Sequence, residues 1–235
     1  MKVALVSTPR SGNTWLRYML ASLYEWEQHA VHTPPSLDWE KLPEGCIVQM
    51  HWHRTSDFTS LLARCGFRAL TIARHPLAVL LSIWQFAPHE PQTANWLEGE
   101  GGNEDTILKA AVASPEFLAY ACSDRARALL SVTPEWWDAP GVARVRYEDL
   151  VDHPQRTLTG LCEALGPPRR SIAETLEAHT LDKLKPTAGN SHFWQGRTDA
   201  WREMIPHEFA LEIAHVHREV FERMGYAAVS GIEGN

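Results

Sequence analysis

Short apolar segments alternate with helical patterns along this chain. The apolar segments, rich in β-branched and aliphatic residues, cover positions 3–6, 46–50, 68–73 and 142–145. Each is bounded by residues that are typical of turns or helix starts. Strands that alternate with helices are typical of a parallel sheet with helices on both of its faces. We therefore expect an α/β fold in three layers, with a central parallel sheet flanked by helices.

Two of the expected helices begin after Asn13 and after Pro76, and a third runs from residue 208 to residue 223. Apolar residues recur in these stretches at helical spacing, which places them on one face of each helix. In the last stretch this face consists of Phe209, Ile213, Val216 and Val220. His215 and His217 lie two residues apart in the same stretch and are expected on the surface.

The composition is that of an ordinary globular protein. The chain has 235 residues, of which 44% are hydrophobic and 22% charged, and this excludes disordered, collagen-like and coiled-coil proteins. The length favours a single domain over residues 1–235. Asp and Glu number 29 against 22 Lys and Arg, and the resulting net charge of −7 disfavours a nucleic-acid partner. Any site for an anion must therefore be local.

The four cysteines are far apart and form no CxxC pair, so we expect buried free thiols. The apolar run at the amino terminus is too short for a signal peptide, and no stretch approaches the roughly 18 apolar residues of a membrane helix. We therefore expect a cytoplasmic protein without a membrane partner. No pattern in the sequence predicts its oligomeric state.

The first predicted strand ends in a polar loop, residues 7–14, that leads directly into a helix. A helix amino terminus offers unpaired backbone N–H groups and a partial positive charge, which suit a phosphate or sulfate group. Gly12 lets the backbone approach an anion, and Arg10 supplies a full positive charge. Side-chain donors come from Ser11, Asn13 and Thr14. The alternative is that these residues only cap the helix.

A second group of anion-binding residues follows the predicted strand 68–73. Arg74 comes at the strand end, Pro76 suits the first turn of a helix, and Ser82 lies about two turns further on. A guanidinium and a hydroxyl in this arrangement can grip a phosphate together. The alternative is that Arg74 pairs with a surface carboxylate and Ser82 is an incidental helix residue.

The loop is P-loop-like, but the GxxxxGK[ST] sequence of ordinary ATP- and GTP-binding loops is missing. Residues 8–15, Thr-Pro-Arg-Ser-Gly-Asn-Thr-Trp, instead resemble the motif Tyr-Pro-Lys-Ser-Gly-Thr-Thr-Trp of the sulfotransferases that use 3′-phosphoadenosine 5′-phosphosulfate (PAPS). The resemblance implies that residues 10–14 bind the 5′ side of the nucleotide and that Trp15 stacks on the adenine. Arg74 and Ser82 match the family's Arg-Asn-Pro motif and the Ser eight residues after its Arg, which implies that they bind the 3′-phosphate.

Two later segments also resemble this family. Tyr147 opens a Tyr-Glu-Asp-Leu segment whose Tyr reaches the adenine in the family. Gly196 keeps the place of the first Gly in the carboxyl-terminal motif Arg-Lys-Gly-x-x-Gly-Asp-Trp, whereas Trp194 and Gln195 replace its two basic residues. Arg197, one residue further on, is the candidate that would replace this second clamp on the 3′-phosphate.

Two histidines follow the predicted strand 46–50, and strand alternation places His51 and His53 on the same face. They suggest three roles: a metal site, which lacks further ligands at nearby spacing, two polar residues with structural partners, or a general base. In the sulfotransferase family a strand in this position ends in Lys-Thr-His, and the His is the base. His51 falls on that His, and Gln49 replaces the Lys, which leaves Arg10 a larger share of the charge stabilisation.

We therefore predict an enzyme that transfers a sulfuryl group in line from PAPS to a hydroxyl of a small molecule and releases 3′,5′-adenosine bisphosphate (PAP), with no metal. His51 would take the proton of the hydroxyl, and Arg10 would hold charge on the leaving nucleotide. The alternatives are a P-loop phosphotransferase that acts on a small metabolite and a non-catalytic nucleotide-binding protein. The acceptor pocket is expected in residues 88–115, with a Gly-rich loop at 98–103, and Trp52, Trp84 and Trp96 are candidates to line it.

Overall fold

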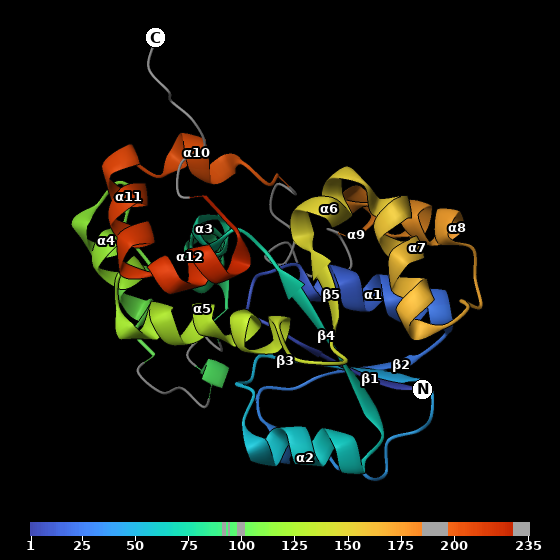
Figure 1. The fold of residues 1–235 in the computed structure, drawn as a ribbon. Helices are drawn as coiled ribbons and strands as arrows, with labels where there is room; N and C mark the ends of the chain where they lie inside the picture. Colours follow the sequence, from blue (N-terminus) through green and yellow to red (C-terminus); the bar gives the residue numbers. More distant parts are fainter. Residues whose placement is uncertain (91–92, 94, 98–101, 185–196, 228–235) are drawn as a thin grey trace.

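The computed structural model describes residues 1–90, 93, 95–97, 102–184 and 197–227. Its centre is a sheet of five strands in the order β2-β3-β1-β4-β5, and every neighbouring pair is parallel (Figure 1). The strands are β1 (Lys2–Val6), β2 (Glu27–Ala30), β3 (Cys46–Met50), β4 (Phe67–Ala73) and β5 (Ala143–Arg146). The predicted α/β fold and its four apolar strands are confirmed, and β2 is an additional strand.

Helices cover both faces of this sheet, as expected for three layers (Figure 1). The α-helices are α1 (Asn13–Tyr24), α2 (Ser56–Arg64), α3 (Pro76–Phe86), α4 (Pro115–Ala121), α5 (Asp124–Trp137), α6 (Tyr147–Asp152), α7 (Pro154–Leu165), α8 (Ile172–Ala178), α9 (Leu181–Leu184), α10 (Ala200–Met204), α11 (His207–Val216) and α12 (Arg218–Met224). Short 3-10 helices are η1 (Pro34–Ser36), η2 (Ala87–His89) and η4 (Glu104–Ile107).

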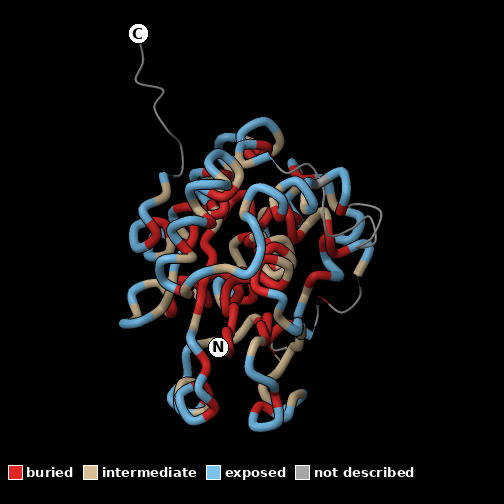
Figure 2. The backbone as a smooth tube through the Cα atoms, turned by 90° about the vertical axis from the view of Figure 1, so that its right-hand side faces the viewer, coloured by how far each residue is buried: buried red, intermediate tan, exposed pale blue. Residues whose placement is uncertain are grey.

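The two faces of β1 supply two separate cores because side chains alternate along a strand. Val3 and Leu5 pack with α1, α6 and α7 on one face, whereas Ala4 and Val6 pack with α2, α3 and α5 on the other. All five residues of β1 are buried. Figure 2 shows these buried segments gathered in the middle of the molecule beneath exposed outer turns.

The parallel register brings three strand ends to one edge of the sheet. Val6, the last residue of β1, pairs with Met50, the last residue of β3, and β4 lies on the other side of β1. The residues after these strands therefore come together, which is where ligands bind in open α/β sheets. Arg10, His51 and Arg74 all follow strands at this edge.

The predicted helix 208–223 is two helices, α11 and α12, because the helical conformation is interrupted at His217. The prediction that His217 is a surface residue is wrong: only 2% of it is exposed, and its Nε2 lies 2.7 Å from the carbonyl oxygen of Ala121 on α4. His215 is exposed, as predicted. The imidazole of His217 satisfies a buried backbone carbonyl, and this ties the carboxyl-terminal helices to the core.

All four cysteines are free thiols, as predicted; Cys46 and Cys65 are buried, whereas Cys122 and Cys162 are only half-buried. Within the ranges described above, no helix combines the length and the apolar character that a membrane span requires.

Candidate active site

The loop between β1 and α1 depends on two residues with a left-handed backbone. Arg10 has φ 63° and Gly12 has φ 97°. A Cβ atom on Gly12 would lie 2.5 Å from Cδ2 of Tyr147, so the site has no room for a side chain. Arg10 adopts a conformation that is uncommon for a residue with a side chain, and such strain is concentrated at functional sites.

Buried hydrogen bonds hold this loop in place. The side-chain amide of Asn13 donates to the carbonyl of Thr8 at 3.0 Å, and the hydroxyl of Ser7 bonds to the amide oxygen of Asn13. Thr8 and Thr133 of α5 exchange two bonds, from the N–H of each to the hydroxyl of the other, at 2.8 and 3.1 Å. The Asn13 side chain, predicted as an anion donor, thus braces the loop, while its backbone N–H remains at the start of α1 with that of Thr14.

Three residues predicted to bind the nucleotide meet at the sheet edge. Arg10 donates from Nε to the hydroxyl of Ser82 at 3.2 Å, and Arg74 donates from Nη1 to the carbonyl of Arg10 at 3.0 Å. The guanidinium of Arg10 also lies 3.9 Å from the centre of the Phe86 ring. Burial, together with the neighbouring charge of Arg74, lowers the pKa of Arg10 to about 9. The cluster is strongly electropositive.

The same cluster contains two buried polar atoms without a partner. Within the described residues, neither the hydroxyl of Ser11 nor Nε of Arg74 forms a hydrogen bond. Ser11 is only 1% exposed, and buried donors in native structures are nearly always satisfied. A free hydroxyl and a free guanidinium N–H next to the Arg10 guanidinium are suited to the oxygens of phosphate or sulfate. The donor set therefore fits the anionic groups of a nucleotide such as PAPS.

The two aromatic residues predicted to contact adenine lie next to this cluster. The Trp15 and Tyr147 rings are 6.2 Å apart and nearly perpendicular, at 69°. Tyr147 begins α6, directly after β5, and the guanidinium of Arg74 lies 4.4 Å from the centre of its ring. The indole N–H of Trp15 donates to the carbonyl of His179 at 2.9 Å. The structure thus brings Trp15 and Gly12 at the start of α1 together with Arg74 and Tyr147, from three separate segments.

His51 is held in the tautomer that a general base requires. Its Nδ1 lies 2.8 Å from the carbonyl oxygen of Ser7, so Nδ1 carries the proton and donates it to that carbonyl. The lone pair is then on Nε2. Burial lowers the pKa of His51 to about 4, and the charge of Arg10 acts in the same direction. The ring is therefore neutral at physiological pH.

His53 has a different environment. Its Nδ1 lies 2.9 Å from Oε1 of Glu135 on α5, and the other carboxylate oxygen of Glu135 accepts from the backbone N–H of Arg54. This corresponds to the predicted alternative of a polar histidine with a structural partner. In the described part of the chain, no three His, Cys, Asp or Glu side chains gather as metal ligands would.

A cation lies beside Gln49, although the sequence suggests that one is lost there. Arg17 of α1 donates from Nε to Oε1 of Gln49 and from Nη1 to Oε1 of Gln28, both at 3.0 Å. Sequence analysis missed Arg17. The available signal is helical spacing, since Arg17 follows Asn13 by four residues and so lies on the same face of α1.

The carboxyl-terminal part of the site is described only from Arg197 onwards, and Gly196 lies outside the described residues. The guanidinium of Arg197 bonds to Asp199 at 3.1 Å and to Glu203 at 3.0 Å. Its carbonyl oxygen lies 3.4 Å from Nη2 of Arg74. The backbone at Arg197 therefore meets the cluster, while its side chain pairs with carboxylates.

Several solved structures share this fold. Mouse sulfotransferase SULT7A1 complexed with PAP is 14% identical, with a TM-score of 0.63 over 96% of this chain and 89% of that one. Retinol dehydratase in a complex with retinol and PAP is 16% identical, with a TM-score of 0.62 over 94% and 81%. A sulfotransferase domain from the curacin biosynthetic pathway is 16% identical, with a TM-score of 0.54 over 96% and 97%.

Sequence comparison identifies the family. No curated protein sequence matches the chain at a significant level. The model of the sulfotransferase domain matches residues 1–225, which is nearly the whole chain. The prediction of a sulfotransferase is therefore confirmed, and the chain belongs to the sulfotransferase family.

Proposed function

We propose that this enzyme transfers the sulfuryl group of PAPS to a hydroxyl of a small molecule, with His51 as the general base. The observation that carries the proposal is the cluster at the sheet edge, where the Ser11 hydroxyl and Nε of Arg74, which have no hydrogen-bond partner among the described residues, adjoin Arg10. His51 is close enough to this cluster for the charge of Arg10 to lower its pKa. The proposed anion site and the proposed base thus lie at the same edge of the sheet.

The nucleotide-binding residues divide into three groups. Arg10, with the backbone N–H groups and hydroxyls of residues 11–14, would hold the 5′ phosphosulfate end. Arg74 and Ser82 would hold the 3′-phosphate, because the Ser82 oxygen accepts from Arg10 and its O–H can still donate to the ligand. Trp15 and Tyr147 would enclose the adenine. The nucleotide supplies an activated sulfuryl group, and these side chains fix its orientation.

The base acts on the acceptor. An alcohol is a weak nucleophile, and Nε2 of His51 would remove its proton as the new oxygen–sulfur bond forms. The bond from Nδ1 to the carbonyl of Ser7 keeps the ring in place throughout. Arg10 and the loop N–H groups would stabilise negative charge on the departing nucleotide. One related fold, retinol dehydratase, is known in complex with a small alcohol, retinol, which supports a small hydroxyl compound as acceptor.

Calorimetric titration with PAP, ADP and ATP-Mg²⁺ tests the nucleotide site. We expect a clear preference for PAP, because Arg74 recognises a 3′-phosphate that the other two lack. Arg74→Ala should weaken PAP binding by about 10- to 100-fold, since it removes a charge-assisted hydrogen bond worth about 1.5–3 kcal/mol. Arg68→Ala, an exposed Arg at the opposite end of β4, is the matched control. Equal binding of all three nucleotides, or a preference for ATP-Mg²⁺, would contradict the proposal.

Turnover of PAPS with a panel of hydroxyl compounds tests the base. His51→Ala should lower kcat by about 10²- to 10⁴-fold while PAP affinity is retained, which is the usual contribution of a general base. His53→Ala is the control, because His53 pairs with Glu135. A loss in His53→Ala without a loss in His51→Ala would make His53 the base. Tight binding of PAP without turnover on any acceptor would favour a non-catalytic nucleotide-binding protein.

A further inference from the structure

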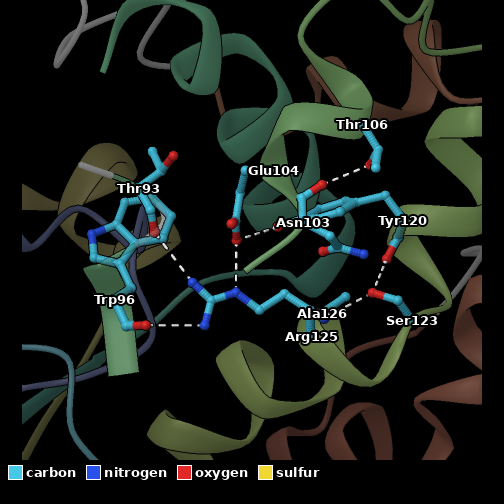
Figure 3. A network of polar contacts seen from close by, with 9 residues as sticks. All are labelled: Thr93, Trp96, Asn103, Glu104, Thr106, Tyr120, Ser123, Arg125 and Ala126. Carbon is cyan, nitrogen blue, oxygen red and sulfur yellow. Dashed lines mark hydrogen bonds and ion pairs between the residues drawn. The ribbon is translucent and has the colours of Figure 1, made fainter. Parts of the chain in front are cut away.

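A buried ion pair links α5 to the start of η4. Arg125 and Glu104 have side chains only 1% and 2% exposed, and Nε of Arg125 lies 2.8 Å from Oε1 of Glu104. The hydroxyl of Tyr120 donates to the same carboxylate oxygen at 3.2 Å. Figure 3 shows the guanidinium at the centre of this network. The pair is far more buried than the other ion pairs found in the described ranges.

The guanidinium also bonds to backbone that lies outside any long helix or strand. Nη1 donates to the carbonyl of Trp96 at 3.0 Å, and Nη2 donates to the carbonyl of Thr93 at 3.2 Å (Figure 3). Both residues are buried, and a buried carbonyl requires a donor. Arg125 therefore supplies hydrogen bonds that regular secondary structure would supply elsewhere.

Packing alone does not account for an ion pair at this place. Moving two charges out of water is unfavourable, and apolar residues of similar volume often stabilise a core as well or better. What a planar guanidinium can do is bond in several fixed directions at once. Here those directions lead to Glu104, Thr93 and Trp96, so the guanidinium fixes the backbone of Thr93 and Trp96 relative to α5 and to Glu104.

The segment fixed in this way carries an aromatic ring to the base. Trp96 is 5% exposed, and the centre of its ring lies 5.9 Å from that of the His51 imidazole. The two ring planes meet edge-on at 78°. It also stacks on Phe86, with ring centres 6.2 Å apart at 7°. Phe86 in turn lies under the guanidinium of Arg10. Trp96 thus contacts the base directly and the cationic loop through one ring.

We infer that Arg125 is a positioning residue for sulfuryl transfer: it holds the backbone of Trp96 so that the indole shields His51 from water and forms a wall of the acceptor site. This inference rests on the proposed role of His51. It makes Trp96 a specificity-determining residue, because an acceptor whose hydroxyl reaches Nε2 of His51 presents its neighbouring carbon atoms to the indole. Acceptors with charged groups next to the hydroxyl would be disfavoured there.

The test removes the ion pair as a unit, so that no unpaired charge remains buried. The double variant Arg125→Met/Glu104→Leu keeps similar side-chain volume, and Trp96→Ala removes the ring itself. Arg127→Ala, an exposed Arg on the same helix, is the matched control. Each protein is examined by thermal unfolding, PAP titration, acceptor kinetics and NMR titration of the His51 ring, whose signal is assigned with His51→Asn.

Positioning predicts a specific combination of results. In the double variant and in Trp96→Ala, PAP affinity should stay within about twofold of wild type. The His51 titration should move up towards its ordinary value of about 6.5 as water reaches the ring, and kcat/KM for the acceptor should fall by about tenfold or more. Arg127→Ala should change none of these.

Two results would overturn the inference. A folded double variant with an unchanged His51 titration and unchanged acceptor kinetics would make the pair merely structural. A changed titration in the double variant but not in Trp96→Ala would show that the indole is not the shield. Failure of the proposed function is distinguishable, because wild-type protein would then lack PAPS turnover while the NMR titration still reports whether Arg125 controls the surroundings of His51.

Discussion

Gly12 is a position where both the backbone and its neighbours exclude a side chain. Its φ of 97° disfavours other residues, and a Cβ atom would meet the Tyr147 ring at 2.5 Å. Gly12→Ala should therefore displace a ring assigned to the adenine, weaken PAP binding, and lower the free energy of unfolding by about 1–3 kcal/mol. Urea unfolding and PAP titration measure the two effects.

The matched control for this change is Gly160→Ala on α7. That glycine is helical, and nothing lies within 4 Å of the position its Cβ would take. Ala there should raise stability by about 0.5–1 kcal/mol, because Gly is the weaker helix former. Equal effects of the two substitutions would show that the Tyr147 contact does not limit the loop.

Gln49 binds the guanidinium of Arg17, at the position where the family motif Lys-Thr-His has its Lys. Its Oε1 accepts from Arg17 at 3.0 Å. Gln49→Lys would place a second positive charge against this guanidinium, and we expect stability to fall by about 1–3 kcal/mol. Combining it with Arg17→Ala should recover much of the loss, and urea unfolding of the four proteins gives the coupling energy. Additive effects in this cycle would contradict repulsion between the two cations.

At the scale of elements, hydrophobic patterning predicts those strands that are buried. β1 and β3 are buried along their whole length, so their apolar residues mark them clearly. β2 reads Glu-Gln-His-Ala, is mostly exposed, and exists because it pairs with β3. An edge strand of this kind leaves no apolar signal. The break at His217 is missed for a related reason: it depends on a carbonyl of α4 that is distant in sequence.

The same distinction applies to the active site. His51 and Arg74 directly follow strands and Arg10 lies in the loop after β1, so all three are predictable because parallel strand ends meet at one edge. The contact of Arg17 with Gln49 and that of Trp96 with His51 join residues from separate segments. No local pattern reports which side chains such packing brings together. The sequence therefore predicts the nucleotide side of the site better than the acceptor side.

At the scale of the whole molecule, histidines whose pKa values are lowered by burial make stability dependent on pH. Burial lowers the pKa values of both His51 and His75 to about 4. His75 caps α3 by accepting from the N–H of Leu77 through Nδ1, so its Nε2 carries the proton and donates to the carbonyl of Ala227. It also stacks on Trp201, with ring centres 4.3 Å apart. Both rings are thus held in their neutral form.

The sign of the effect follows from proton binding. In the unfolded chain these imidazoles titrate near 6.5, so between pH 6.5 and pH 4 the unfolded state binds more protons than the folded state. The contribution of these groups to the free energy of unfolding should therefore be constant above pH 6.5 and fall as the pH is lowered towards 4. The loss should be at most about 3 kcal/mol for each histidine. Urea unfolding at a series of pH values between 7.5 and 4 measures this slope.

His75→Asn isolates the contribution of His75. Asn keeps an acceptor for the N–H of Leu77 but cannot gain a proton, so this variant should lose up to about 3 kcal/mol less stability than wild type between pH 7.5 and pH 4, whatever its stability at neutral pH. His215→Asn, at an exposed histidine on α11, should leave the slope unchanged. Saturating PAP should flatten the His51 part in the folded protein, because a bound anion favours the protonated ring. A slope that neither His75→Asn nor PAP alters would place the acid sensitivity in other groups.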